Sequence, residues 1–290
     1  GLSNPARYNR AAPLRGDGTG KPRPEENMPP AAETEGKMKY ENLVFDLYGT
    51  LVDIHTETDL DIMWEKTALY YGFYGAHYTP QSFRKAYLAL TAAEESAAGQ
   101  DYECFPELQI ERIFEKLFEE KGVSANRERL AWNAAQLFRI LSIDYIRLYP
   151  GVKETLQAFR EEGHRLWLLS NAQRVFTAYE MEALGLTECF DGIYISSDYG
   201  CRKPDRRFFD ALLTEQGIRP EEALMIGNDL QTDIAGGRNA GMKTLYIHSN
   251  LSPAKDGKAA AEKAAAADYR AEGADWFEIG KRIRKICMRG

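Results

Sequence analysis

Residues 46–53 read Asp-Leu-Tyr-Gly-Thr-Leu-Val-Asp, and this stretch decides the fold that we predict. The preceding residues 39–45 read Lys-Tyr-Glu-Asn-Leu-Val-Phe and end in an apolar run that is typical of a buried parallel strand. The Gly-Thr pair at 49–50 then breaks the strand. Asp46 is therefore delivered at the carboxyl end of a central strand, where open α/β sheets bind their ligands. For Asp46 taken alone, an aspartate that merely starts a turn is the simpler explanation.

The composition and charge of the chain argue against several classes of function. Its 290 residues suffice for one large or two medium domains, and 44% hydrophobic residues are ordinary for a globular protein. The 44 acidic and 37 basic residues give a net charge of −7 without a long basic run, so we expect no nucleic-acid partner. No apolar run approaches the length of a membrane span, so no membrane partner is expected either. The four cysteines form no CxxC pair, which favours reduced thiols and a cytoplasmic location.

Three kinds of segment follow one another along the chain. Residues 1–37 are rich in Pro, Gly, Arg and Glu, so we expect a disordered leader with Met38 as the natural start. Residues 55–148 carry a Thr-Pro helix start, glycine stops and apolar stripes, which predict a small bundle of amphipathic helices. Residues 38–54 and 149–290 alternate strands with helices that end at glycines. This pattern predicts a doubly wound parallel sheet of the α/β class, into which the helical domain is inserted.

The inserted segment contains four predicted helices, at residues 59–71, 80–98, 106–121 and 126–142. Aromatic residues gather near the first two of these helices. We expect them to fill the core of the bundle, and a wall that contacts the substrate is the alternative. These residues are Tyr70, Tyr71, Phe73, Tyr74 and Tyr78.

Polar residues stand at or beyond the ends of four core strands, which we predict at residues 39–45, 165–169, 192–196 and 223–227, and a further strand is predicted at residues 243–247. Each of them alone is explained by surface polarity, since lysine in particular is rarely buried. Their order along the chain is far more specific than any one of them. The polar residues at these strand ends, and at the helices that follow, are Asp46, Ser170 with Asn171, Lys203, and Asp229 with Asp233.

In this order the four motifs resemble those of the haloacid dehalogenase-like (HAD) hydrolase superfamily, over about residues 38–286. The helical insertion directly after the first motif is similar to the C1-type cap of that superfamily. The resemblance implies that Asp46 is a nucleophile that forms and releases an aspartyl intermediate. It also implies Mg²⁺, which would offset the repulsion between a carboxylate and an anionic phosphoryl group.

The resemblance also assigns a role to each motif residue. Lys203 would neutralise charge that develops on the transferring group and on Asp46. The implied catalytic residues are Asp46, Ser170 and Lys203. The implied metal ligands are Asp46, Tyr48 through its backbone carbonyl, Asp229 and Asp233. The implied substrate-binding residues are Tyr48, Gly49, Thr50 and Asn171.

Tyr48 departs from the phosphatase pattern, in which a second Asp stands two residues after the nucleophile and protonates the leaving oxygen. A tyrosine there resembles the 2-haloacid dehalogenases. Against that interpretation, Asp229 and Asp233 are both present, and no Arg occurs between Asp46 and Arg84. General acid–base help is worth roughly 10²–10⁴-fold, so its loss would matter most for poor leaving groups. The residues that could replace the missing acid are Asp53, His55, His77 and the hydroxyl of Tyr48.

We therefore predict a Mg²⁺-dependent HAD-type hydrolase, most consistent with a phosphatase that acts on a small phosphorylated metabolite. A 2-haloacid dehalogenase-like C–halogen hydrolase is the first alternative. A weakly active or non-catalytic protein that binds a phosphorylated ligand is the second. The expected partner is a small-molecule substrate, and a monomer or a homodimer is expected.

Overall fold

The computed structural model describes residues 38–97, 105–253 and 267–288. Its centre is a six-stranded sheet in the order β5-β4-β1-β6-β7-β8, and every neighbouring pair of strands runs parallel. The strands are β1 (Asn42–Phe45), β4 (Arg165–Ser170), β5 (Gly192–Ile195), β6 (Ala223–Gly227), β7 (Lys243–His248) and β8 (Tyr269–Glu272). The predicted doubly wound parallel sheet is confirmed. The expected leader, residues 1–37, lies outside the described residues.

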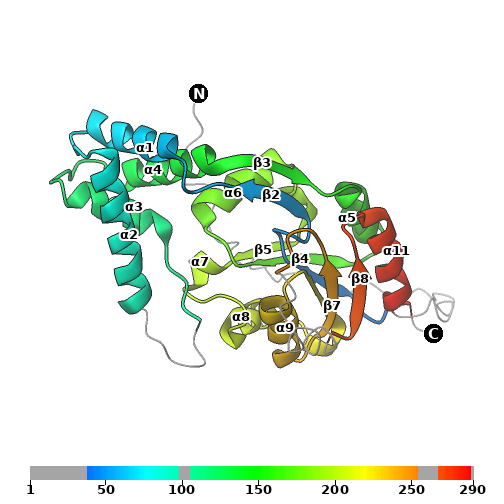
Figure 1. The fold of residues 1–290 in the computed structure, drawn as a ribbon. Helices are drawn as coiled ribbons and strands as arrows, with labels where there is room; N and C mark the ends of the chain where they lie inside the picture. The colour runs from blue at the N-terminus through cyan, green and yellow to red at the C-terminus, as the bar shows by residue number, and fades with distance from the viewer. Residues whose placement is uncertain (1–37, 98–104, 254–266, 289–290) are drawn as a thin grey trace, which may run out of the picture. The chain divides into compact units, whose positions relative to one another are not determined.

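Helices cover both faces of this sheet (Figure 1). Successive side chains of a strand point to opposite faces. Leu43 and Phe45 accordingly join the core that includes α5 and α11, whereas Val44 joins the core that includes α8. A strand buried on both faces reads as a continuous apolar run, as the sequence of β1 does. The helices are α5 (Val152–Glu161), α6 (Arg174–Ala183), α7 (Ser196–Tyr199), α8 (Arg206–Gln216), α9 (Ala235–Asn239) and α11 (Trp276–Cys287).

Four helices that lie between β2 (Val52–Thr56) and β3 (Ile143–Leu148) in the chain form a second hydrophobic core. They are α1 (Asp61–Phe73), α2 (Pro80–Ala97), α3 (Ile110–Glu119) and α4 (Arg127–Ser142). Tyr71 is fully buried in this core, where its ring stacks on Phe118 and its hydroxyl donates to the carbonyl oxygen of Phe114 at 2.7 Å. Phe73 is 80% exposed and Tyr74 is 46% exposed, so the expectation of a core position is wrong for these two residues.

Two strands that the sequence did not predict flank the helical segment. β2 (Val52–Thr56) and β3 (Ile143–Leu148) pair in antiparallel fashion. The third helix begins at Ile110 instead of residue 106. The backbone before it is extended and bound elsewhere, because Phe105 O accepts from Arg202 N at 2.9 Å and Glu107 N donates to Gly200 O at 3.2 Å. The domain boundaries at residues 55 and 148 stay a prediction.

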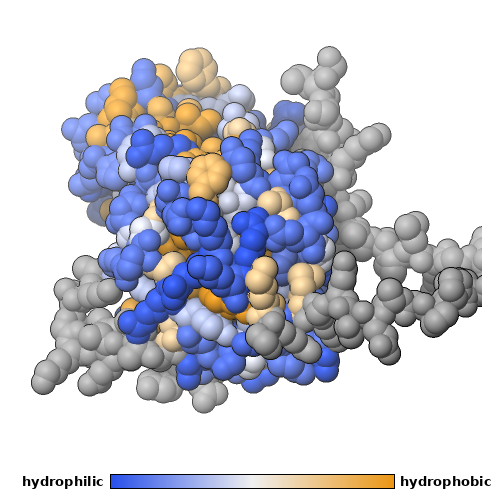
Figure 2. Space-filling model, turned by 90° about the vertical axis from the view of Figure 1, so that its right-hand side faces the viewer, coloured by the Kyte–Doolittle hydropathy of each residue, from blue (hydrophilic) through white to orange (hydrophobic). Residues whose placement is uncertain are grey.

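The surface of the described residues is mainly hydrophilic on the face shown in Figure 2, and apolar residues gather at its upper edge. Several large apolar side chains on α1 are exposed, among them Ile62, Leu69 and Phe73. Within the described ranges, no helix has both the length and the apolar character that crossing a membrane requires.

Candidate active site

The predicted motif residues meet at one edge of the sheet. Asp46 follows β1, Ser170 ends β4, and Asn228 follows β6. These three strands are neighbours in the order β4-β1-β6, and all are parallel. Their carboxyl ends therefore lie side by side, which brings together residues that are far apart in the sequence.

Lys203 is the residue that joins these strand ends. Its side chain is 1% exposed, and its Nζ lies 2.7 Å from each of three oxygens, Asp46 Oδ1, Asp233 Oδ1 and the carbonyl oxygen of Leu169. Burial alone would lower the pKa of Lys203, but the two adjacent carboxylates raise it above its ordinary value. The ammonium group therefore stays charged between Asp46 and Asp233.

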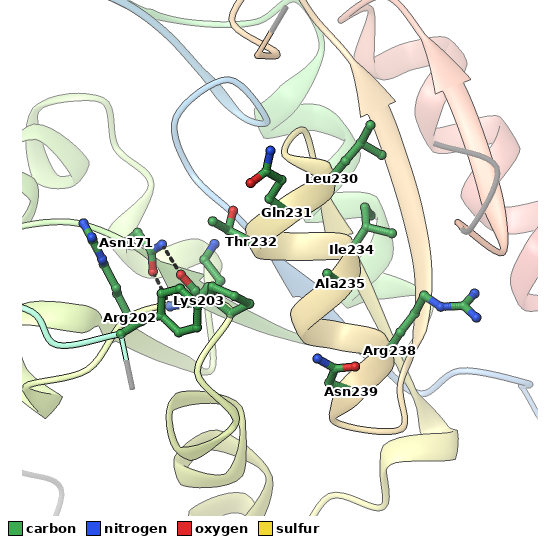
Figure 3. Close-up of a pocket in the computed structure, with 12 residues that line it drawn as sticks. Asn171, Arg202, Lys203, Leu230, Gln231, Thr232, Ile234, Ala235, Arg238 and Asn239 are labelled. Atoms are coloured by element: carbon green, nitrogen blue, oxygen red, sulfur yellow. Dashed lines mark hydrogen bonds between the residues drawn. The ribbon is translucent and has the colours of Figure 1, made fainter. Parts of the chain in front are cut away.

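Asn171 holds the backbone of Lys203 in place. Its Nδ2 donates to the carbonyl oxygen of Lys203 at 2.9 Å, and its Oδ1 accepts from Lys203 N at 2.7 Å (Figure 3). Both ends of the amide are thus engaged with the chain itself. Asn171 thus fixes the backbone at Lys203, and its expected role in substrate binding stays a prediction.

Thr50 and Gly49 shape the loop that follows the carboxylate of Asp46. The hydroxyl of Thr50 donates to Asp46 Oδ2 at 3.1 Å and lies 3.3 Å from Asn228 Oδ1. Gly49 has a φ of +82°, and a Cβ at this position would lie 2.1 Å from Asn228 Nδ2. Only glycine fits here, because both the backbone conformation and the close approach of Asn228 exclude a side chain.

Asp229 and Asp233 face different partners, although they stand four residues apart. Asp229 Oδ1 accepts from the backbone N–H groups of Gln231 and Thr232, so this carboxylate caps the short helical turn at Leu230–Ile234. Asp233 is 1% exposed and points inward to Lys203. A Cβ on Gly227 would lie 2.2 Å from Asp233 Oδ2, so the glycine at the end of β6 makes room for this carboxylate.

Asp233 has a perturbed ionisation. Burial and the nearby charge of Asp46 raise its pKa to about 7, although Lys203 opposes this effect. Burial is the largest of these effects and accounts for the direction of the shift.

The donor set of the site agrees in part with a magnesium ion. The carboxylates of Asp46 and Asp233 converge, and hard oxygen donors of this kind are the ligands that Mg²⁺ prefers. Across the described residues, however, no three His, Cys, Asp or Glu side chains are grouped as metal ligands. Asp229 Oδ1 binds the start of the helical turn, and the roles of Asp229 and of the Tyr48 carbonyl as metal ligands stay predictions.

The side chain of Tyr48 is directed to helix α6. Its hydroxyl donates to Glu180 Oε2 and lies 2.9 Å from Thr177 Oγ1. Burial and the negative charge of Glu180 raise the pKa of Tyr48 well above its ordinary value, so the phenol is a weaker acid than free tyrosine.

The other three candidates for the missing acid lie in different environments. Burial favours the neutral form of Asp53, but hydrogen bonds from Asn250 and Arg147 outweigh it and lower the pKa of this carboxyl. His55 is exposed on β2 and lies 3.6 Å from Asp144. His77 is exposed between α1 and α2. Asp53 is held as an anion, which makes it a poor proton donor.

Two functional candidates were missed by sequence reasoning. Arg139 of α4 and Glu180 of α6 form an ion pair, with Nε and Oε1 2.6 Å apart. Glu180 is 5% exposed and stands at helical spacing among the buried residues Thr177 and Met181 of α6. A charged residue on the buried face of an amphipathic helix is the signal that could have identified it.

A cavity of about 640 Å³ opens beside Lys203. Its wall combines the side chains of Asn171, Arg202, Gln231 and Thr232 with that of Phe105 (Figure 3). Amide, hydroxyl and guanidinium groups next to a buried lysine can hold a small polar or anionic molecule.

A carboxylate, a buried lysine and a second carboxylate thus meet beside the carboxyl ends of a parallel sheet. A family model described as haloacid dehalogenase-like hydrolase matches residues 40–241, which is more than half of the chain. The chain belongs to this family.

Known proteins similar to the chain include two phosphatases. Glyceraldehyde 3-phosphate phosphatase of Methanothermobacter thermautotrophicus is 33% identical over 110 residues, which are 38% of this chain and 49% of that protein. Phosphoserine phosphatase of Thermus thermophilus is 34% identical over 143 residues, 49% of this chain and 56% of that protein. The chain thus spans about half the length of these curated relatives.

Among solved structures, a 2-haloacid dehalogenase from Pseudomonas syringae pv. Tomato DC3000 matches with a TM-score of 0.55 at 19% identity. The match covers 84% of this chain and 99% of that chain. At this level of identity the likeness concerns the fold alone.

Proposed function

We propose that the chain is a Mg²⁺-dependent phosphatase that hydrolyses a small phosphorylated metabolite through the nucleophile Asp46. The observation that carries this proposal is the buried contact of Lys203 with Asp46 and Asp233, each at 2.7 Å. The similarity to phosphatases of glyceraldehyde 3-phosphate and phosphoserine supports the same class of substrate. A cytoplasmic location and a monomeric or homodimeric state remain predictions.

In the proposed reaction, a carboxylate oxygen of Asp46 forms a bond to phosphorus as the bond to the leaving oxygen breaks. Water then attacks the phosphorus of the aspartyl phosphate, which releases phosphate and restores Asp46. Thr50 holds Asp46 through Oδ2, and Lys203 offsets negative charge at the reacting centre. Ser170 is fully buried, and its Oγ has no hydrogen-bond partner among the described residues, so it is available to the transferring group.

Magnesium would be held by Asp46 and Asp233, with the backbone carbonyl of Tyr48 and Asp229 as further candidates. Bound there, Mg²⁺ would supply positive charge that offsets the repulsion between the nucleophile and the phosphoryl oxygens. Asp229 Oδ1 accepts from the N–H groups of Gln231 and Thr232, so Oδ2 is the oxygen through which this carboxylate would bind the metal.

The proposed phosphatase lacks an evident proton donor for the leaving group. The hydroxyl of Tyr48 binds Glu180, and Asp53 is held as an anion by Arg147 and Asn250. Good leaving groups, such as those of acyl phosphates, aryl phosphates and phosphoanhydrides, therefore form the substrate class that this site suits best.

A C–halogen hydrolase is the second candidate function, and Tyr48 at the position of the phosphatase acid is the observation that favours it. A halide leaving group needs no proton. Against it, Asp233 adds a buried carboxylate beside Asp46, which suits a metal site better than a neutral dehalogenase pocket. Phospho-ligand binding without turnover is the remaining alternative.

One screen separates these functions. Purified protein is assayed with p-nitrophenyl phosphate and Mg²⁺, with 2-chloropropionate without metal, and for Mg²⁺ binding by calorimetry. We expect Mg²⁺-dependent release of p-nitrophenol that Asp46→Asn abolishes. Chloride release without metal would favour the dehalogenase, and Mg²⁺ binding without any turnover would favour the binding protein.

A further inference from the structure

We propose that Arg139 and Glu180 are positioning residues, which fix the loop carrying Asp46 through the hydroxyl of Tyr48. The kinetic part of this proposal rests on the proposed phosphatase function, whereas its structural part does not. The three residues come from three elements, α4, α6 and the loop after β1.

The contacts form a continuous polar chain. Arg139 Nε donates to Glu180 Oε1 at 2.6 Å, and Arg139 Nη2 donates to Oε2 at 3.3 Å. Oε2 also accepts the hydroxyl of Tyr48, and the guanidinium carbon lies 5.8 Å from the centre of the Tyr48 ring. The carboxylate of Glu180 thus accepts hydrogen bonds from both Arg139 and Tyr48. Removal of either partner leaves this buried carboxylate less well paired.

The loop at the end of this chain has little freedom of its own. Gly49 N donates to Val52 O at 2.8 Å, and Leu51 N donates to Leu47 O at 2.8 Å. Tyr48 lies within this tight turn, two residues from Asp46. Because backbone and side chain of Tyr48 are both held, a shift of its hydroxyl is transmitted to the position of the nucleophile.

Packing between α4 and α6 is incomplete beside the ion pair. An apolar cavity of about 330 Å³ lies there, and Arg139 and Glu180 form part of its wall together with Ile143, Phe176 and Leu184. Beside this cavity, the ion pair of Arg139 with Glu180 connects α4 to α6.

The inference gives the helical segment a part in catalysis that does not require contact with substrate. Arg139 belongs to α4, and it reaches the loop that carries Asp46 through Glu180 and through the ring of Tyr48. Misplacement of reacting atoms by about 1 Å can cost roughly 10²-fold in rate, and this is the scale of effect that such a chain can control.

The test compares Tyr48→Phe, Glu180→Gln and the double variant with the natural protein. Glu115→Gln is the matched control, because Glu115 pairs with Arg127 of the same helix α4 at 3.0 Å and is also partly buried. Two quantities are measured: kcat and KM for p-nitrophenyl phosphate with saturating Mg²⁺, and amide hydrogen exchange of residues 46–52. Tyr48→Phe removes a single oxygen atom and is the variant most certain to fold.

We expect each single variant to lower kcat by about tenfold or more with KM nearly unchanged. The double variant should be no worse than the more affected single variant, because both break the same chain. Exchange at residues 46–52 should become faster in all three, and the control should match the natural protein.

The proposal would be overturned if the amides of residues 46–52 exchange at the same rate in both single variants as in the natural protein. It would also be overturned if the double variant loses kcat by the product of the two single-variant losses. If the natural protein hydrolyses no phosphate ester, the proposed function fails, and hydrogen exchange alone decides the positioning role.

Discussion

Lys203 is the single residue on which the geometry of the site depends. A lysine is rarely buried without partners, and here two carboxylates and a carbonyl oxygen surround its ammonium group. Its removal would leave Asp46 and Asp233 facing each other without a cation. The energetic and the catalytic importance of this residue therefore have the same cause.

Lys203→Met should destabilise the metal-free protein by about 3–5 kcal/mol, because one partner of a buried charge cluster is lost. Chemical denaturation at pH 7.5 measures this. Lys281→Met is the control, since Lys281 and Glu278 form an exposed pair and its removal should cost less than about 1 kcal/mol. Equal stabilities of the two variants would show that the buried cluster contributes nothing.

Asp233 should make the stability of the metal-free protein depend on pH. Its pKa is raised to about 7 in the folded state, whereas an unfolded aspartate titrates near 3.9. The folded state therefore binds this proton more tightly, and the resulting stability is present in acid and is lost as pH rises from about 4 through 7.

The difference in unfolding free energy between the natural protein and Asp233→Asn isolates this contribution from that of other groups. It should fall with rising pH across that window, and the stabilisation by Mg²⁺ should grow over the same range because the metal requires the ionised carboxylate. A difference that does not change between pH 4 and 8 would contradict the raised pKa.

At the scale of elements, the proposed phosphatase function gives the loop between β1 and β2 an influence on how the leaving group departs. The side chain of Tyr48 in this loop binds α6, so this position supplies no acid that protonates the leaving oxygen. For a series of aryl phosphates, kcat/KM should rise steeply as the pKa of the phenol falls. Rapid-quench kinetics should show that chemistry limits the rate. A flat dependence under that condition would mean that another residue donates the proton.

The segment before α3 is attached to the core through Gln173. Its Oε1 accepts from Ile110 N at 2.9 Å, and its Nε2 donates to Glu107 Oε1 at 3.0 Å and to Leu108 O at 2.9 Å. Gln173→Ala should cost about 1–3 kcal/mol in unfolding free energy, because buried partners lose their hydrogen bonds.

Gln157→Ala is the matched control for that measurement. Gln157 donates to Glu161 on the exposed surface of α5, so its loss should change stability by no more than about 0.5 kcal/mol. If both variants unfold at the same denaturant concentration, the attachment of this segment does not depend on Gln173.

The same elements show what sequence patterns can predict. The core strands and most core helices were predicted because glycine stops and apolar runs are local signals in the sequence. The bounds of β6, for example, match the predicted strand at residues 223–227. The start of α3 was predicted too early, since the backbone of residues 105–107 pairs with residues 200–202 far along the chain. β2 and β3 were missed because their pairing partner is likewise distant in the sequence.

The candidate site divides in the same way. Motif order brought Asp46, Lys203 and Asp233 to attention, and the structure places them in contact. The hydrogen bonds show that Asp229 caps a helical turn and that Asn171 binds the backbone of Lys203. The spacing of these residues in the sequence does not reveal either contact. Arg139 and Glu180 belong to no motif, and only their meeting in space gives them a role.

At the scale of the whole molecule, a parallel sheet gathers the reacting groups, and a helical segment stands between β2 and β3. The composition of residues 1–37 predicts that they contribute no buried surface to the rest of the chain. A protein that begins at Met38 should therefore melt at the same temperature as the full chain. A clear drop in melting temperature would show that the leader packs on the remainder.

The central claim is that Asp46 becomes covalently phosphorylated during turnover. Rapid acid quenching during turnover of acetyl phosphate with Mg²⁺, followed by mass spectrometry of the peptide that contains residues 46–53, tests this most directly. We predict a phosphoryl adduct on Asp46 that forms within the first turnover and is absent from Asp46→Asn, which should also be inactive. Full turnover by Asp46→Asn, or a phosphoryl group found on another residue, would contradict the claim.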